Sequence, residues 1–261
     1  MTTPQLFVQT GIYGYGIFGR AAEEDLEGTL DMVKAAGYDG VEVMTSLTGD
    51  PRRLSEACAR RGLSISAFHV FWHELADGRQ WDTAEALGTS RVILSGIPSE
   101  NEEAARASIA PLRAFAAEAA ARNMRLLVHN HAEECRPLPS NRTVLEILVE
   151  HTTCEELGYV IDLHWAAVGG DVARTIRTTA DRCDYYHIKD GSITDPEEPH
   201  SYDLGSGEVD LNGAWKEIRS TGTVATVVVE RGMPANDLPA ALHHDARFVR
   251  QLLSDSAENP R

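Results

Sequence analysis

The sequence predicts an α/β fold, a single (β/α)₈ TIM barrel, and three observations support this prediction. The chain has 261 residues, close to the roughly 250 residues of one such barrel. Strand-like and helix-like segments alternate along the chain, which favours a parallel sheet with helices outside it. Four apolar runs each end in a residue that can bind a metal, and in this fold all strands open on one functional face. We therefore expect one domain over residues 1–261, with a loose polar tail at 254–261.

Eight short apolar or β-branched runs predict the strands of this barrel. Runs of this length without polar alternation are typical of buried parallel strands. The predicted strands are 6–9, 41–43, 64–70, 91–94, 125–129, 159–163, 184–188 and 223–229.

A helical pattern follows each predicted strand. Gly37 is expected just after the end of the first helix, and Ser99 is expected to cap the Ala-rich fourth helix. The predicted helices are 23–36, 51–61, 83–87, 100–122, 141–150, 172–180, 211–220 and 238–253. The alternative is a doubly wound open sheet, but the glycines after the first strand lack the G-x-G-x-x-G spacing common in that fold.

Composition limits the partners. With 24 Lys and Arg against 40 Asp and Glu, the net charge is −16, which opposes nucleic-acid binding. We expect no membrane span and no secretory segment. The four cysteines form no C-x-x-C pair, so we expect reduced thiols in a cytoplasmic protein. The expected partner is a small molecule, and a homo-oligomer stays possible.

The fifth strand ends in alternating polar residues, His129, His131 and Glu133. Alternate residues of an extended chain point to one side. If the extended run persists past Asn130, all three face the barrel interior, with His129 deepest, His131 at the mouth and Glu133 in the loop above.

The ends of the sixth and seventh strands offer further ligands. Asp162 follows three apolar residues, and burial of its charge requires a cation or hydrogen bonds. The alternative is that Asp162 caps a backbone turn. His187 suits a ligand, and Lys189 shares its parity and can polarise an oxygen. The alternative for Lys189 is a solvated pair with Asp190.

Carboxylates also end the eighth and second strands. Glu230 follows a β-branched run and is expected to be a metal ligand or a base. Glu42 is a candidate for supporting the site or binding substrate. His69 either lines the pocket or is a core residue.

These motifs occur in the order in which they occur in one superfamily. The chain resembles the xylose-isomerase-like TIM-barrel sugar (phosphate) isomerase/epimerase superfamily from about residue 6 to 253. The motifs are Ala36-Gly37-Tyr38-Asp39-Gly40-Val41-Glu42, His129-Asn130-His131, Asp162-x-x-Trp165, His187-Ile188-Lys189-Asp190, Gly205-Ser206-Gly207-Glu208-Val209-Asp210 and Val229-Glu230.

The resemblance implies one bound divalent cation, Mn²⁺ first, with Co²⁺, Zn²⁺ or Mg²⁺ as alternatives. It implies that Asp162, His187 and Glu230 are ligands. The ketose epimerases have a Glu on strand five where this chain has His129, and a His where it has Trp165. Both departures resemble the branch that holds inosose dehydratase. We therefore expect His129 to complete the metal set.

The resemblance further implies a sugar isomerase or epimerase that removes a proton next to a carbonyl, through an enediolate that the metal stabilises. The expected catalytic residues are His131, Glu133, Glu230 and Lys189, and the expected substrate-binding residues are Glu42, His69, Trp165 and Asp190. The first alternative is a dehydratase or lyase acting on a keto-sugar or keto-cyclitol. A non-catalytic sugar-binding barrel and an endonuclease-like repair enzyme are further alternatives, and the −16 charge opposes the last.

Overall fold

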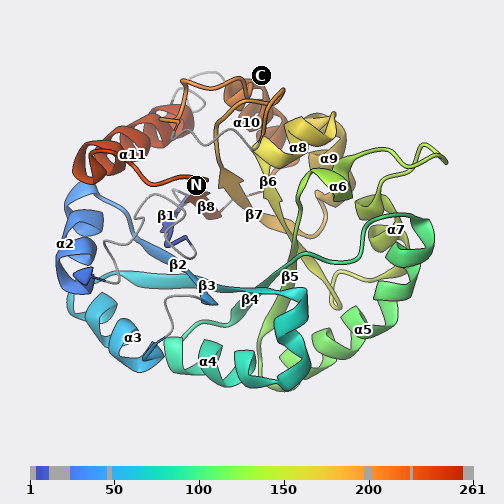
Figure 1. Ribbon diagram of the computed structural model, residues 1–261, viewed down its shortest axis with the longest axis horizontal. Helices are drawn as coiled ribbons and strands as arrows, with labels where there is room; N and C mark the ends of the chain where they lie inside the picture. Colours follow the sequence, from blue (N-terminus) through green and yellow to red (C-terminus); the bar gives the residue numbers. More distant parts are fainter. Residues whose placement is uncertain (1–3, 12–23, 46–48, 197–201, 224–225, 255–261) are drawn as a thin grey trace.

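Eight parallel strands close into a barrel in chain order, and helices surround it (Figure 1). The computed structural model describes residues 4–11, 24–45, 49–196, 202–223 and 226–254. The strands are β1 (Leu6–Gln9), β2 (Gly40–Met44), β3 (Ser64–Phe71), β4 (Arg91–Ser95), β5 (Arg125–His129), β6 (Gly158–Asp162), β7 (Cys183–Ile188) and β8 (Thr226–Val229). The predicted (β/α)₈ fold is confirmed.

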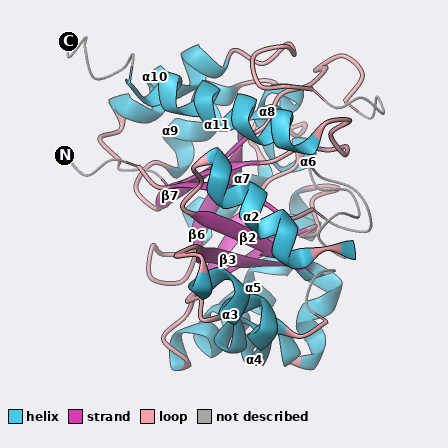
Figure 2. Ribbon diagram, turned by 90° about the vertical axis from the view of Figure 1, so that its left-hand side faces the viewer, coloured by secondary structure: helices cyan, strands magenta, loops and turns pink. Residues whose placement is uncertain are grey.

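The helices enclose the strands, which Figure 2 shows from the side. They are α2 (Leu26–Ala36), α3 (Pro51–Arg60), α4 (Arg79–Leu87), α5 (Glu102–Ala121), α7 (Val144–His151), α9 (Val172–Thr179), α10 (Leu211–Ser220) and α11 (Leu238–Ser254). Three short elements were not predicted, the 3₁₀ helix η2 (Trp72–Asp77), α6 (Ala132–Cys135) and α8 (Leu163–Gly169).

Local chemistry fixes the helix ends. Gly37 ends α2 with φ of 87°, as predicted for a residue that must adopt the left-handed conformation. The predicted cap of α5 is wrong by two residues. Asn101, not Ser99, is the cap, because its side chain accepts a hydrogen bond from the Ala104 N–H at 2.9 Å.

Two layers of side chains fill the barrel above one another. The lower layer is apolar and comes from seven strands, Phe7, Ala67, Ile93, Leu127, Val160, Tyr185 and Val228. Each of these apolar residues is followed two positions later by a polar residue. Because side chains on one face of a strand are two residues apart, the polar residues form the upper layer. These polar residues are Gln9, His69, Ser95, His129, Asp162, His187 and Glu230. The strand period therefore gathers them at the C-terminal mouth, above the apolar layer.

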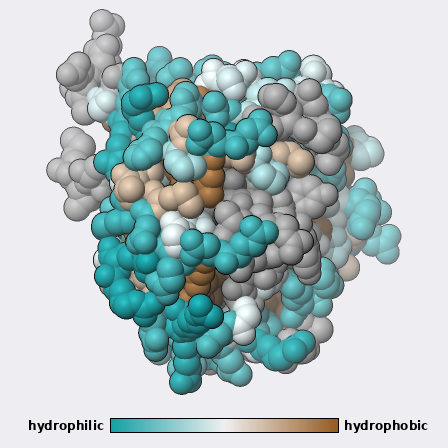
Figure 3. Space-filling model, turned by 60° about the vertical axis from the view of Figure 1, so that its left-hand side comes forward, coloured by the Kyte–Doolittle hydropathy of each residue, from teal (hydrophilic) through white to brown (hydrophobic). Residues whose placement is uncertain are grey.

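The described surface is polar. Hydrophilic residues dominate the face in Figure 3, and among large hydrophobic residues of the described part only Ile193 is exposed, at 37%. No described helix is both long and apolar enough to span a membrane. The four cysteines are free thiols. The cytoplasmic location stays a prediction. The tail at 254–261 lies outside the described residues, apart from Ser254 at the end of α11.

Candidate metal centre

Four strand ends bring one ligand atom each to a common point. His129, Asp162, His187 and Glu230 offer atoms that all lie within 4.8 Å of one another. His129 Nε2 lies 3.9 Å from Asp162 Oδ2 and 3.8 Å from Glu230 Oε2, and His187 Nδ1 lies 2.7 Å from Glu230 Oε2. The register of the sheet places them there, since Asp162 on β6 pairs directly with His187 on β7.

Three of the four atoms of this cluster lack a hydrogen-bond partner among the described residues. His129 Nε2, Asp162 Oδ2 and His187 Nδ1 are buried and have no hydrogen-bond partner within the described part of the chain. Although His187 Nδ1 is close to Glu230 Oε2, the two atoms are not aligned as a hydrogen bond. Buried polar atoms without partners are costly, and one cation at the centre of the cluster would satisfy these three. Two imidazoles and two carboxylates fit Mn²⁺, Co²⁺ or Zn²⁺ better than Mg²⁺.

The electrostatic properties of the cluster fit a site that could bind a cation. Burial raises the pKa of Asp162, and the nearby Glu230 carboxylate raises it further. Burial also lowers the pKa of His129 well below its usual range, so this ring is neutral, as a metal ligand must be. Burial alone would lower the pKa of His187, but the carboxylates of Glu42 and Glu230 raise it to about 10. The metal-free cluster therefore holds a proton where the cation would bind.

The two oxygens of Asp162 have different tasks. Oδ1 accepts a hydrogen bond from the Trp165 N–H at 2.9 Å and caps α8, whereas Oδ2 faces the cluster. The capping role and the ligand role, posed as alternatives from the sequence, are therefore compatible.

Asn130 holds Asp162 in place, and sequence reasoning missed this residue. Its side chain accepts from the Asp162 N–H at 3.0 Å and donates to the Asp162 carbonyl at 3.3 Å. Its position in the alternating strand pattern was the signal that could have identified it. Asn130 lies between two inward-facing histidines, so its side chain points to the neighbouring strand.

His131, Trp165 and Lys189 lie at the mouth of the site. The His131 ring meets the Trp165 ring edge-on at 5.6 Å, and Lys189 Nζ lies 4.7 Å from the centre of the Trp165 ring. Lys189 Nζ also donates to Glu230 Oε1 at 3.1 Å. Within the described residues no hydrogen bond engages the His131 ring. Burial lowers the pKa of His131 to about 4, so its neutral ring can accept a proton.

Glu133 does not join this group. The extended run ends at His129, and α6 begins at Ala132, which turns the Glu133 side chain outward. This side chain is 57% exposed and lies 4.0 Å from Arg136. Glu134 points inward instead, and its Oε2 accepts from the His131 N–H at 2.7 Å. The prediction that Glu133 faces the barrel interior required an extended run past Asn130, and this requirement is not met.

Asp190 is saturated by the backbone and has no group left to bind a substrate. Its carboxylate accepts hydrogen bonds from four backbone N–H groups, those of Gly191, Gly205, Gly207 and Val209. A Cβ atom at position 207 would collide with the carboxylate, so glycine is required there. The substrate-binding role predicted for Asp190 has no support in its contacts, and neither does a solvated pair with Lys189.

Glu42 and His69 pack directly against the cluster and are enclosed by other protein groups. Their side chains are at most 3% exposed, and Glu42 Oε2 lies 2.8 Å from His187 Nε2. Because protein groups enclose both side chains, they support the cluster and do not reach a substrate. Their contacts give no support to the predicted substrate-binding role and favour the supporting role that was the alternative for Glu42.

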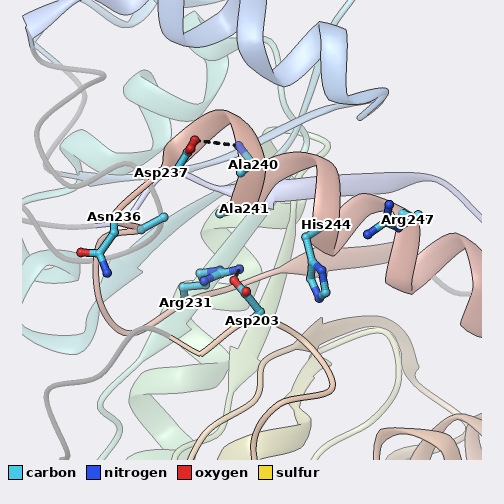
Figure 4. A pocket seen from close by; sticks show the side chains of 9 residues that line it. Asp203, Arg231, Asn236, Asp237, Ala240, Ala241, His244 and Arg247 are labelled. Carbon is cyan, nitrogen blue, oxygen red and sulfur yellow. Dashed lines mark hydrogen bonds and ion pairs between the residues drawn. The ribbon is translucent and has the colours of Figure 1, made fainter.

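A cavity of about 440 Å³ lies beside β8 and α11 (Figure 4). Arg231 borders it and is held by Asp203 at 2.6 Å and by Asp245 at 2.7 Å. None of the site residues predicted from the sequence lines this cavity.

Comparisons with known proteins agree with this architecture. A family model described as "Xylose isomerase-like TIM barrel" matches residues 30–252. A search of curated protein sequences finds no significant match.

Solved structures share the fold at low sequence identity. A sugar phosphate isomerase/epimerase from Parabacteroides distasonis ATCC 8503 has a TM-score of 0.77 at 18% identity, covering 96% of this chain and 94% of that chain. The IOLI protein with a bound zinc atom has a TM-score of 0.73 at 16% identity, covering 96% and 98%. D-allulose 3-epimerase from Methylomonas sp., in complex with D-allulose, has a TM-score of 0.71 at 14% identity, covering 96% and 98%. At these identities the likeness extends to the fold alone.

Proposed function

Since the chain belongs to the xylose isomerase-like TIM barrel family, we propose that it is a divalent-metal-dependent isomerase or epimerase of a small sugar. It would act by removing a proton next to a carbonyl. The observation that carries this proposal is the set of ligand atoms at the mouth, three of which are buried without a hydrogen-bond partner. Similar folds belong to a sugar phosphate isomerase/epimerase and a D-allulose 3-epimerase, which supports the substrate class.

The ligands proposed for the cation are His129, Asp162, His187 and Glu230. When bound, a divalent cation supplies Lewis acidity, which polarises a carbonyl and stabilises the negative charge that develops on it. We propose Mn²⁺ first, with Co²⁺ or Zn²⁺ next, because the donor set mixes imidazole with carboxylate.

The proton is moved by His131 in this proposal. Its ring lies 5.2 Å from the His129 ring, at the rim of the cluster, and no described protein group occupies its nitrogens. Because the ring is neutral, it can take a proton from the carbon and return it elsewhere. Glu230 is a weaker candidate, since His187 and Lys189 already engage its carboxylate.

Lys189 and Trp165 orient the substrate. The ammonium of Lys189 lies between the Trp165 ring and Glu230, so it can stabilise negative charge on a substrate oxygen. The Trp165 ring offers an apolar face against which a sugar ring or chain can pack.

The second candidate is a dehydratase or lyase acting on a keto-sugar or keto-cyclitol. The observation that favours it is His129, which occupies a position where the resemblance places Glu in ketose epimerases. Both reactions begin with the same proton removal. They differ in whether the carbon is reprotonated or a β-substituent leaves.

One experiment tests both candidates. The Mn²⁺-loaded protein is incubated in D₂O with D-allulose and with a 3-keto-glucoside, and products are followed by NMR and mass spectrometry. The proposal predicts an isomer that carries deuterium next to the carbonyl, whereas the alternative predicts loss of water or of an alkoxyl group. Binding of these sugars without exchange or elimination would contradict both and favour a non-catalytic binding barrel. The Asp162→Ala variant is the control for contaminating enzymes.

A further inference from the structure

Glu42, in the C-terminal half of β2, is not a proposed ligand, but it is connected to three of the four proposed ligands. The carboxylate is fully buried and accepts four hydrogen bonds. Oε1 accepts from Gln9 Nε2 at 2.9 Å and contacts His69 Nδ1 at 3.0 Å. Oε2 accepts from the Tyr185 hydroxyl at 2.7 Å and contacts His187 Nε2 at 2.8 Å. Four contacts use the full accepting capacity of a carboxylate.

The contact with His187 fixes which nitrogen of that ring carries hydrogen. A carboxylate can only accept, so His187 Nε2 donates to Glu42. When the ring is neutral, its lone pair therefore lies on Nδ1, which is the nitrogen that faces Glu230 in the cluster.

A longer path fixes the tautomer of His129. His69 Nδ1 donates to Glu42, so His69 Nε2 must accept from the Ser95 hydroxyl, 2.6 Å away. The Ser95 oxygen then accepts from His129 Nδ1 at 3.1 Å. This direction leaves the lone pair of His129 on Nε2, the nitrogen that faces Asp162. Opposite nitrogens of the two histidines therefore face the cluster, and one carboxylate sets both.

The third connection runs through Gln9. Its amide nitrogen has two hydrogens, and it donates one to Glu42 Oε1 at 2.9 Å and one to Glu230 Oε2 at 3.0 Å. The Glu230 oxygen that faces the cluster is therefore held in place from β1.

We propose that Glu42 is the positioning residue of the metal centre. Through His187 directly, through His69 and Ser95 to His129, and through Gln9 to Glu230, it directs three lone pairs at one point. Outer partners of this kind orient metal ligands and set their tautomers. The inference rests on the proposed metal-dependent function but concerns cation binding, which is measured without any substrate.

The isosteric change Glu42→Gln predicts a specific failure. An amide accepts at one end only and donates at the other. If the amide nitrogen faces His69, the His69–Ser95 path reverses and places an N–H of His129 in the cluster. If it faces His187, that ring turns its N–H toward Glu230. Either arrangement opposes cation binding.

The test compares Co²⁺ affinity, measured by competition with a chelator, in wild type and single variants. Glu42→Gln is expected to bind about 10–100-fold more weakly, and Ser95→Ala about 10-fold more weakly with an altered visible Co²⁺ spectrum. The matched control is Ser108→Ala, because the buried Ser108 hydroxyl donates to the Ala105 carbonyl within α5, outside the Glu42 network. It should stay within about twofold of wild type.

A second readout reports the tautomers. In the Zn²⁺-loaded wild type, ¹⁵N NMR of labelled histidine should show coordination through Nε2 of His129 and through Nδ1 of His187. Coordination of both rings through the same type of nitrogen would overturn the inference.

Unchanged Co²⁺ affinity in Ser95→Ala and Glu42→Gln would also overturn it, and Ser95→Ala serves alone if Glu42→Gln does not fold. A wild type that binds one Co²⁺ but transforms no sugar contradicts only the proposed function. A wild type that binds no Co²⁺ contradicts both.

Discussion

Asp162 and Asp190 follow neighbouring strands and are both buried, yet they have opposite relations to their surroundings. Asp190 accepts four backbone N–H groups and has no capacity left. One oxygen of Asp162 caps α8. The other faces the cluster and has no hydrogen-bond partner within the described part of the chain. The comparison shows that a carboxylate at a strand end is a candidate metal ligand when one of its oxygens has no hydrogen-bond donor. Its residue type alone does not make it a candidate.

The largest expected effect separates the two acids directly. Asp162→Asn keeps an oxygen that can cap α8 but loses the anionic ligand, so cation affinity should fall more than about 100-fold, beyond the loss typical of an outer partner. Elemental analysis after gel filtration measures it. Retention of one metal per chain would contradict the ligand role that separates Asp162 from Asp190.

A second effect concerns the proton that occupies the cluster in the metal-free protein. The pKa of His187 is raised to about 10, so a cation must displace its proton at neutral pH. Affinity for Mn²⁺ should therefore rise about tenfold per pH unit between about pH 6.5 and 8.5. Calorimetry in two buffers of different ionisation enthalpy measures the released proton. Affinity that does not depend on pH would contradict the assignment.

The same shift predicts how the metal-free fold responds to pH. The folded pKa of His187 lies above the usual value near 6.5, so its stabilising contribution is complete below pH 6.5 and is lost as pH rises through about 10.

The matched change at the other acid should affect stability and leave the metal in place. Asp190→Asn leaves buried backbone N–H groups unsatisfied and should cost about 2–3 kcal/mol in free energy of unfolding. Urea denaturation of the metal-free protein checks this value, and metal analysis of the folded variant should give wild-type stoichiometry. A loss of bound metal without loss of stability would reverse the roles of the two acids.

The smallest effect is expected at Glu133. Its side chain is 57% exposed on α6, so Glu133→Gln should change cation affinity and sugar turnover by less than about twofold. A decrease of tenfold or more in turnover would show that Glu133 reaches the substrate.

The sequence predicts that the four proposed ligands lie together, because their positions depend on local pattern. Each lies at the C-terminal end of a buried strand, and the barrel brings all strand ends to one face. The network around Glu42 is harder to predict, because Gln9, His69 and Ser95 come from three other strands and are connected to it only through the register of the closed sheet. The contacts of Asp190 could not be predicted, because three of its four partners lie on a loop 15–19 residues away, whose conformation no local pattern predicts. The inward direction predicted for the Glu133 side chain is wrong, because α6 begins at Ala132 and ends the alternation.

The most direct test of the metal centre is anomalous diffraction from a crystal grown with Mn²⁺. One peak is predicted, roughly 2.0–2.3 Å from His129 Nε2, Asp162 Oδ2, His187 Nδ1 and Glu230 Oε2, and none at Asp190. A peak held by other residues, or an empty cluster at saturating Mn²⁺, would contradict the account.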